Sequence, residues 1–151
     1  KSLLDGQGVD AVALVGGADE RDQCAPLLQL AAEDSRVVDL IGATTVGGLL
    51  GVIERSALVV ANDSAALHIA VGFDRPVVAL YGPTRVALVG PWTREGSVIQ
   101  HIRPNERLDH KNEAAGADIM SRITVGEALE AADRALGSAA TPEGSRAATM
   151  H

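Results

Sequence analysis

Mostly apolar runs alternate with amphipathic stretches along the chain. Four of these runs cover residues 10–17, 36–41, 57–61 and 76–82. A run that is apolar at successive positions is typical of a strand buried on both faces, as in parallel sheets. Residues 97–102, SVIQHI, predict one more strand of the same kind.

The stretches between the first runs have the composition of helices. We expect the first helix to begin near Asp22, because that start places Pro26 in or just beyond the first turn, where proline is tolerated. Residues 44–57 carry apolar side chains at helical spacing and predict a second helix, with Thr44 or Thr45 as its N-cap.

Two further helices are expected later in the chain. Residues 64–72 predict a short helix between two apolar runs. The segment ITVGEALEAADRALG predicts a closing amphipathic helix, capped by Thr124 and stopped by Gly137.

Strands and helices therefore alternate, which predicts an α/β fold with a doubly wound, Rossmann-like parallel sheet. We expect this domain to cover residues 1–137. Residues 138–151 are rich in Ala, Ser, Thr and Gly and are expected to form a tail without regular structure. The chain opens without Met, close to its first predicted strand, so we expect it to be the second half of a longer protein.

Charge and aromatic content narrow the classes of function. The 151 residues carry a net charge of -7, which disfavours a phosphate-neutralising stripe and therefore a nucleic-acid partner. The aromatic residues are Phe73, Tyr81 and Trp92 alone, so a platform for stacking single-stranded bases is not expected. No apolar stretch reaches the ~18–20 residues of a membrane span, and direct membrane insertion is not expected.

Cysteine and histidine positions give little support to a metal site. The single cysteine, Cys24, excludes an internal disulfide and a multi-cysteine zinc site, and it fits a reducing compartment. His101 and His110 are isolated, and His151 is terminal. We expect these histidines to face solvent and no metal to be bound.

Three segments follow predicted strands, where open parallel sheets bind their ligands. They are GGADE (16–20), NDSAALH (62–68) and YGPTR (81–85). Small residues there let a ligand approach the backbone, and helix starts direct unpaired N–H groups towards it. This combination favours an anionic ligand such as a diphosphate.

The segment NDSAALH is the most informative of the three. If Asp63 is the N-cap, Ser64 and His68 lie four residues apart on one helix face. The N–H groups of Ser64, Ala65 and Ala66 then form a cup for a phosphate, and the His68 imidazole lies one turn further on.

Other interpretations of NDSAALH stay open at this point. Asp and Ser are common helix caps, and a lone His on an apolar helix is often a hydrogen-bonded core residue. A serine hydrolase triad is disfavoured because the residues are adjacent on one short helix and no GxSxG elbow is present. The dinucleotide fingerprint GxGxxG and the Walker GK[ST] motif are absent as well.

A longer pattern resembles a known family. The segment VVANDSAALHIAVGFDRPVVALYGPT is similar to the signature of the family 9 glycosyltransferases, the lipopolysaccharide heptosyltransferases. That signature is an apolar strand, Asp-Ser/Thr-Gly-x-x-His, a short helix and Pro-Val-Val-x-Leu-Phe/Tyr-Gly-Pro-Thr. The resemblance extends upstream through LVGGADERD and DLIGATTVGGLLGVIERS and downstream through DIMSRITVGEALEAA, roughly residues 10–137 in one order.

The resemblance implies the C-terminal, donor-binding half of a GT-B enzyme that transfers a sugar with inversion and without a metal or other cofactor. The donor substrate would be an ADP-sugar, typically ADP-heptose. Asp63 would contact the donor sugar. The other donor-binding residues implied are Ser64, Ala65, Ala66 and His68 near the diphosphate, Glu20 at the ribose, Ala43 or Thr44 near the adenine, and Thr84 at the pocket border.

The remaining functions are expected outside this sequence. The resemblance implies that the catalytic base and the contacts to the lipopolysaccharide inner-core acceptor lie in an N-terminal half, so this chain alone is not catalytically complete. The full enzyme is expected in the cytoplasm, at the inner face of the inner membrane. Ala65 stands where the family has Gly, and a positive φ at that position would be strained.

Two alternatives to the heptosyltransferase interpretation remain. One is another GT-B sugar-nucleotide enzyme with UDP or GDP specificity, such as a UDP-GlcNAc epimerase-type enzyme. The other is a degenerate, non-catalytic domain that keeps the fold but not the pocket.

Overall fold

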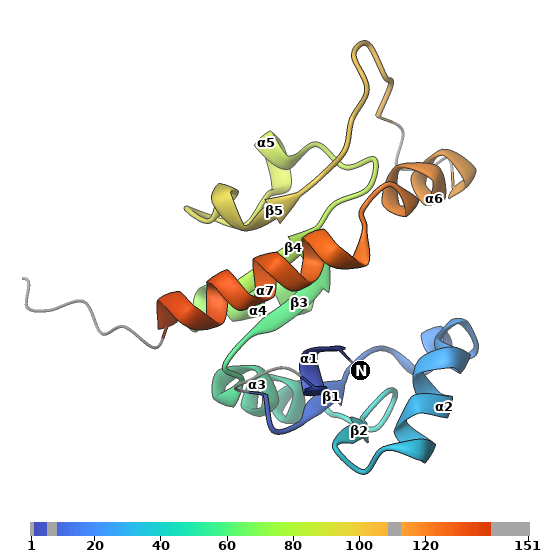
Figure 1. The fold of residues 1–151 in the computed structure, drawn as a ribbon, viewed down its shortest axis with the longest axis vertical. Helices are drawn as coiled ribbons and strands as arrows, with labels where there is room; N and C mark the ends of the chain where they lie inside the picture. The colour runs from blue at the N-terminus through green and yellow to red at the C-terminus, as the bar shows by residue number, and fades with distance from the viewer. Residues whose placement is uncertain (1, 6–8, 109–112, 140–151) are drawn as a thin grey trace, which may run out of the picture. The chain divides into compact units, whose positions relative to one another are not determined.

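The computed structural model describes residues 2–5, 9–108 and 113–139, and the chain divides into two units, Lys1–Arg55 and Ser56–His151. Both units contain helices and parallel strands (Figure 1). The first contains α1 (Ser2–Asp5), β1 (Val12–Leu14), the 3-10 helix η1 (Ala18–Cys24), α2 (Ala25–Glu33), β2 (Val37–Asp39) and α3 (Val46–Arg55).

The first unit is built on two parallel strands. β1 pairs with β2 so that Val12 lies opposite Val37, and α2 packs on β2. Its buried apolar residues are Leu4, Val37, Ile41 and Ile53. Ile53 comes from α3, whose start is capped as predicted, because the Gly48 amide donates to Thr45 Oγ1 at 3.1 Å.

The first long helix begins later in the chain than the sequence predicts. Helix α2 begins at Ala25, three residues after Asp22, and η1 occupies the intervening residues. Pro26 lies within the first two helical positions, where its missing N–H has no intrahelical partner to lose and its fixed φ suits the helix. The proline therefore marks the helix start more closely than the acidic residues before it.

The described residues of the second unit form three strands and the remaining helices. In chain order these are β3 (Val59–Asn62), α4 (Ala65–Gly72), β4 (Val77–Leu80), α5 (Val86–Val89), the 3-10 helix η2 (Glu95–Ser97), β5 (Val98–Ile99), α6 (Glu113–Ser121) and α7 (Val125–Ala139). The strands are all parallel, in the order β3-β4-β5 (Figure 1).

Strand β4 is the centre of the second unit. Val77, Val78 and Ala79 are all buried, and because successive strand residues point to opposite faces, both faces of β4 are covered. Helices α4 and α7 both pack on β4, as does η2, and α4 also packs on β3. The predicted α/β class with parallel strands is thus confirmed, with the strands paired as two in the first unit and three in the second.

The closing helix has the predicted cap and a different end. The Glu127 amide donates to Thr124 Oγ1 at 3.2 Å, and Glu127 Oε2 accepts from the Thr124 amide at 2.8 Å, which is a capping box. Gly137 does not stop α7, which continues to Ala139. Gly137 lacks the positive φ of a helix-terminating glycine, and an interior glycine costs a helix only about 1 kcal/mol.

The tail prediction is tested only at its first residues. Ser138 and Ala139 are helical, whereas residues 140–151 lie outside the described residues, and so do His110 and His151. The domain boundaries 1–137 and 138–151 stay predictions. The short helices α1 and α5 and the helix α6 were not predicted.

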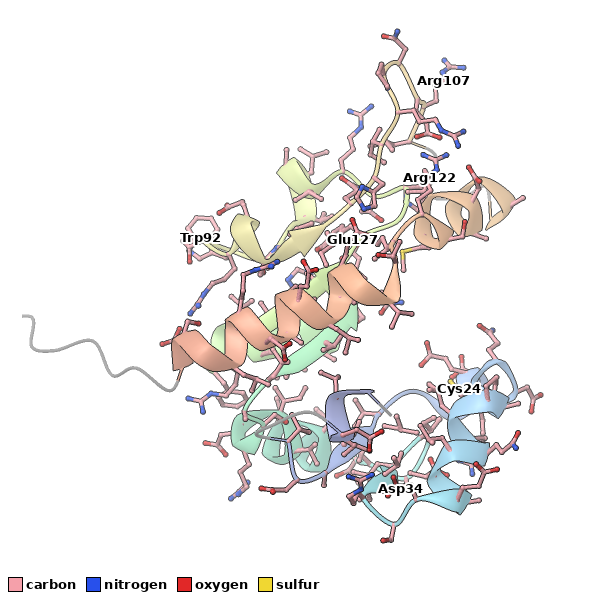
Figure 2. The ribbon with its side chains drawn as sticks, in the orientation of Figure 1. Cys24, Asp34, Trp92, Arg107, Arg122 and Glu127 are labelled. Carbon is pink, nitrogen blue, oxygen red and sulfur yellow. The ribbon has the colours of Figure 1, made fainter. Side chains whose placement is uncertain are left out.

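An arginine network joins the segment after β5 to α6 and to the turn before α7. Arg122, labelled in Figure 2, lies in the turn between α6 and α7. Its guanidinium forms two 2.6 Å bonds to the Glu106 carboxylate, bonds to Asp118, and donates to the His101 carbonyl at 2.9 Å. These hydrogen bonds from Arg122 lower the pKa of Glu106 to about 2.

We expect Glu106→Gln to lower the melting temperature of the full-length protein by a few degrees near neutral pH. The pKa of an unfolded glutamate is about 4.3, so the pair contributes stability above that pH. The contribution is lost as the pH falls towards about 2. Melting temperatures measured from pH 7 to pH 2 should therefore converge for the two proteins.

The control is Glu130→Gln, which removes the same charge from an exposed glutamate whose Arg134 partner is 3.8 Å away. Its melting temperature should follow that of the natural protein at every pH. A difference for Glu106→Gln that persists unchanged at pH 2 would contradict the assignment of the stability to this ion pair.

Candidate functional site

The candidate residues divide between the two units. Glu20, Ala43 and Thr44 belong to the first unit, and the second contains Asp63, Ser64, Ala65, Ala66, His68 and Thr84. Within each unit, they follow the carboxyl ends of parallel strands. Ligands of open α/β sheets bind at this position.

Helix α4 begins directly after a bend that follows β3. Its N-cap is Ser64, one residue later than the predicted Asp63, and Ser64 has an extended backbone with φ −151° and ψ 166°. The Ser64 hydroxyl makes no capping hydrogen bond. The first N–H groups of α4 have no carbonyl one turn earlier to bind, so Ser64, Ala65 and Ala66 present hydroxyl and amide donors at the end of β3.

Ala65 fits this geometry without strain. It is the first residue of α4, and among the described residues positive φ is confined to Asp74, Thr93, Asn105 and Gly42. A residue with helical backbone gains from Ala relative to Gly. The departure from glycine at this position therefore does not distort the start of α4.

Asp63, His68 and Tyr81 meet beside this helix start. His68 Nε2 lies 3.6 Å from Asp63 Oδ1, and the two side chains are 48% and 27% exposed. The Tyr81 hydroxyl lies 3.4 Å from the same oxygen and 3.0 Å from the Val89 carbonyl. Burial, followed by the nearby Asp63 carboxylate, raises the pKa of Tyr81 to about 12. Sequence reasoning identified Asp63 and His68 as neighbours but missed Tyr81.

Thr84 lies in a turn that a glutamine holds. Gln100 Nε2 donates to the Gly82 carbonyl at 2.7 Å and to the Thr84 carbonyl at 2.8 Å. Gly82 packs on α6, since a Cβ there would lie 3.1 Å from Met120 Cγ. Gln100 was missed in the sequence, where its signal is a lone amide in the apolar run SVIQHI.

In the first unit, Glu20 is held by the turn that carries it. The Gly17 amide donates to Glu20 Oε2 at 2.7 Å. The neighbouring Arg21 bonds to Asp39 Oδ2 at 2.7 Å and donates to the Ile41 carbonyl at 3.1 Å. The pKa of Asp39 is lowered, first by its bond to Arg21. These contacts tie the segment after β1 to the end of β2.

Ala43 and Thr44 follow a close approach between these two segments. The Gly42 amide donates to the Gly16 carbonyl at 2.9 Å. Gly42 has φ +71°, and a Cβ there would lie 2.9 Å from the Ala18 Cα, so only glycine fits. The first unit thus places Ala43 near the turn of Glu20. Thr44 lies before the capping residue of α3, which is Thr45.

The described residues offer neither a metal site nor a membrane-spanning helix. No group of three His, Cys, Asp or Glu side chains suited to a metal ion occurs within them. Across the same residues, no helix is long and apolar enough to cross a membrane. His101 differs from the expectation of an isolated residue, because its Nε2 lies 2.8 Å from Glu127 Oε1.

Comparison with known proteins decides the family. The family model for glycosyltransferase family 9 (heptosyltransferase) matches residues 3–117. The chain belongs to glycosyltransferase family 9. The family resemblance of residues 59–84 is therefore confirmed and extends over most of the chain.

Curated relatives of this family 9 chain include lipooligosaccharide heptosyltransferase 2 of Haemophilus influenzae. It is 35% identical over 117 residues, which are 76% of this chain and 34% of the relative. Lipopolysaccharide heptosyltransferase 2 of Escherichia coli is 31% identical over 118 residues, 77% of this chain and 33% of the relative. The chain thus spans about a third of the length of these relatives.

Solved structures support the same fold. The structure of E. coli ADP-heptose lps heptosyltransferase II matches with a TM-score of 0.71 and 25% identity over 87% of this chain and 38% of that chain. A glycosyl transferase family 9 protein from Veillonella parvula matches with a TM-score of 0.70 and 22% identity, covering 85% of this chain and 37% of that chain. The Rossmann-like domain of a GT-B glycosyltransferase is thus the fold of this chain.

Proposed function

We propose that this chain binds the sugar-nucleotide donor, ADP-heptose, of an inverting heptosyltransferase in lipopolysaccharide core synthesis. The observation that carries the proposal is the start of α4. Ser64 has a hydroxyl without a capping bond, Ala65 and Ala66 are small, and Asp63 and His68 lie 3.6 Å apart beside them. One of the matching structures is named for ADP-heptose, which supports ADP as the nucleotide.

The α4 start has the chemistry that sugar transfer requires. The bond between the anomeric carbon and the diphosphate oxygen breaks, and the electron pair leaves with the nucleoside diphosphate. Helix N–H groups and the His68 imidazole stabilise the charge that develops there. This stabilisation needs no metal ion, and Asp63 accepts hydrogen bonds from the sugar hydroxyls.

The proposal gives each of the other candidate residues a role within its own unit. Glu20 binds the ribose, Ala43 or Thr44 lies near the adenine, and Thr84 borders the pocket. The contacts that hold Glu20 in its turn and Thr84 through Gln100 support these assignments, since both residues are held at strand ends.

The acceptor side belongs to residues outside this sequence. The acceptor is the lipopolysaccharide inner core, whose hydroxyl oxygen attacks the anomeric carbon from the opposite face. A base in another part of the enzyme takes the hydroxyl proton. We propose that the enzyme works in the cytoplasm, at the inner face of the inner membrane.

Titration of the full-length protein with ADP, UDP and GDP tests the proposal. A ligand at ten times its Kd adds about 1.4 kcal/mol of stability, which thermal unfolding detects. We expect stabilisation by ADP alone, and about tenfold weaker ADP binding in His68→Ala. The control Arg134→Ala removes a cation from the exposed part of α7, where its side chain is 71% exposed, and should leave ADP binding unchanged.

The other outcomes point to the alternatives. Stabilisation by UDP or GDP instead of ADP would replace ADP-heptose with another sugar nucleotide as the donor. A correctly folded full-length protein that binds none of the three nucleotides would reject the donor site altogether and support a degenerate domain.

A further inference from the structure

Tyr81 stands at the same level of the sheet as Asp63. Strands β3 and β4 are parallel, and Asn62 lies opposite Leu80, so the next residues along the two strands are Asp63 and Tyr81. Tyr81 is fully buried, whereas the Asp63 side chain is 27% exposed. The tyrosine therefore approaches Asp63 from the interior, opposite to the side that a ligand can reach.

The hydroxyl of Tyr81 contacts two acceptors. It lies 3.0 Å from the Val89 carbonyl and 3.4 Å from Asp63 Oδ1. A phenol has one proton to donate, and an arrangement with two acceptors shares that proton between them. With a pKa of about 12, Tyr81 keeps this proton at neutral pH and acts as a donor.

Both neighbours of Asp63 approach the same carboxylate oxygen. The Tyr81 hydroxyl and His68 Nε2 are nearest to Oδ1, and in the part of the chain that the structure describes no hydrogen bond to Oδ2 is found. A carboxylate offers lone pairs on both oxygens. Contacts to one oxygen fix the plane of the carboxylate and leave the other for a ligand.

We propose that Tyr81 is a positioning residue for donor recognition, because its buried hydroxyl holds Asp63 Oδ1 so that Oδ2 faces the donor sugar. This inference rests on the proposed function of Asp63 in sugar binding. It predicts that Tyr81 affects binding of the sugar and not binding of the nucleotide, although Tyr81 touches neither.

Calorimetric titration of the full-length protein with ADP-heptose and with ADP tests the inference. We expect Tyr81→Phe, which removes one oxygen and keeps the ring, to weaken ADP-heptose binding about tenfold. ADP binding should change less than twofold. In an Asp63→Asn background, the same substitution should have little further effect, because the two residues act as a coupled pair.

Ser97→Ala is the matched control. The Ser97 hydroxyl also donates to a backbone carbonyl, that of Arg94, at 2.7 Å, but Ser97 lies outside the site. Its removal should change neither affinity. The contact itself is measured without a ligand, as the phenol absorbance of natural protein minus that of Tyr81→Phe during alkaline titration. The midpoint of this titration is the pKa of Tyr81. Asp63→Asn should lower this pKa from about 12, because a nearby negative charge is lost.

The outcomes separate the two proposals. Unchanged ADP-heptose affinity in Tyr81→Phe overturns the positioning role and leaves the proposed function standing. An equal loss of ADP and ADP-heptose binding also overturns it, since that result indicates a general structural defect. If the natural protein binds ADP and ADP-heptose with equal affinity, the proposed role of Asp63 in sugar binding is wrong. The positioning role of Tyr81 is then wrong as well.

Discussion

Ala65→Asp is expected to weaken nucleoside diphosphate binding on the order of 1000-fold while the protein stays folded. Ala65 is the first residue of α4 and is exposed. A carboxylate there lies where we place the diphosphate, and two negative charges about 4 Å apart repel by roughly 4 kcal/mol near a protein surface. Affinity for ADP, measured by calorimetry on the full-length protein, checks the prediction.

The unfolding free energy of Ala65→Asp should change little, in contrast to its affinity for ADP. An acidic side chain in the first turn of a helix interacts favourably with the helix dipole, by about 0.3–1 kcal/mol. Neighbouring Asp63 opposes this gain, so the net change in unfolding free energy is expected within about 1 kcal/mol. Loss of binding without loss of stability distinguishes an electrostatic effect from a folding defect.

Ala65→Asn provides the matched comparison, because Asn has nearly the shape of Asp without its charge. We expect Asn to weaken ADP binding by much less than Asp does. Equal losses for the two variants would indicate steric exclusion and not charge, and undiminished ADP binding in Ala65→Asp would exclude the start of α4 as the diphosphate site.

The elements predicted most reliably from the sequence are those that their own residue types are sufficient to indicate. Strand β4 has buried residues at Val77, Val78 and Ala79 on both faces, so its sequence is continuously apolar. The predicted Thr124 cap is equally local, because its partner Glu127 lies within one helical turn. Such features need no knowledge of the rest of the fold.

Features that depend on distant partners were either not predicted from the sequence or predicted at the wrong residue. Helix α6 packs through Met120 against Gly82, which lies far earlier in the chain. Nothing in the local pattern of residues 113–121 indicates this contact. The end of α7 was misplaced for a related reason, since Gly137 ends a helix only if its backbone adopts a positive φ, and residue type alone does not decide that.

The same distinction applies to the candidate site. Asp63, Ser64 and His68 became candidates because they are neighbours in sequence on one strand–helix turn. Tyr81 and Gln100 were missed because their roles arise across strands. Tyr81 reaches Asp63 from the position after β4, and Gln100 reaches the Thr84 carbonyl from the segment after β5. The sequence therefore suggested candidate ligand-facing residues, whereas the residues that hold them in place required the sheet.

Leu67→Ala is expected to produce the largest loss of stability. Leu67 is fully buried in α4, which packs on β3 and β4. Replacing a buried leucine by alanine removes its transfer free energy and leaves a cavity, for a total cost of about 2–5 kcal/mol. Amide hydrogen exchange of β4 residues in the full-length protein should accelerate by at least ~30-fold, since 1.4 kcal/mol corresponds to a factor of ten.

Leu88→Ala removes the same atoms from α5, where the Leu88 side chain is 75% exposed. It should change the free energy of opening, as measured by exchange of the β4 amides, by no more than about 0.5 kcal/mol. Similar acceleration in both variants would contradict the view that burial of α4 holds the second unit together. Because Leu67 directly follows Ala66, loosening α4 also displaces the first-turn amides. Leu67→Ala should therefore weaken ADP binding as well, and Leu88→Ala should not.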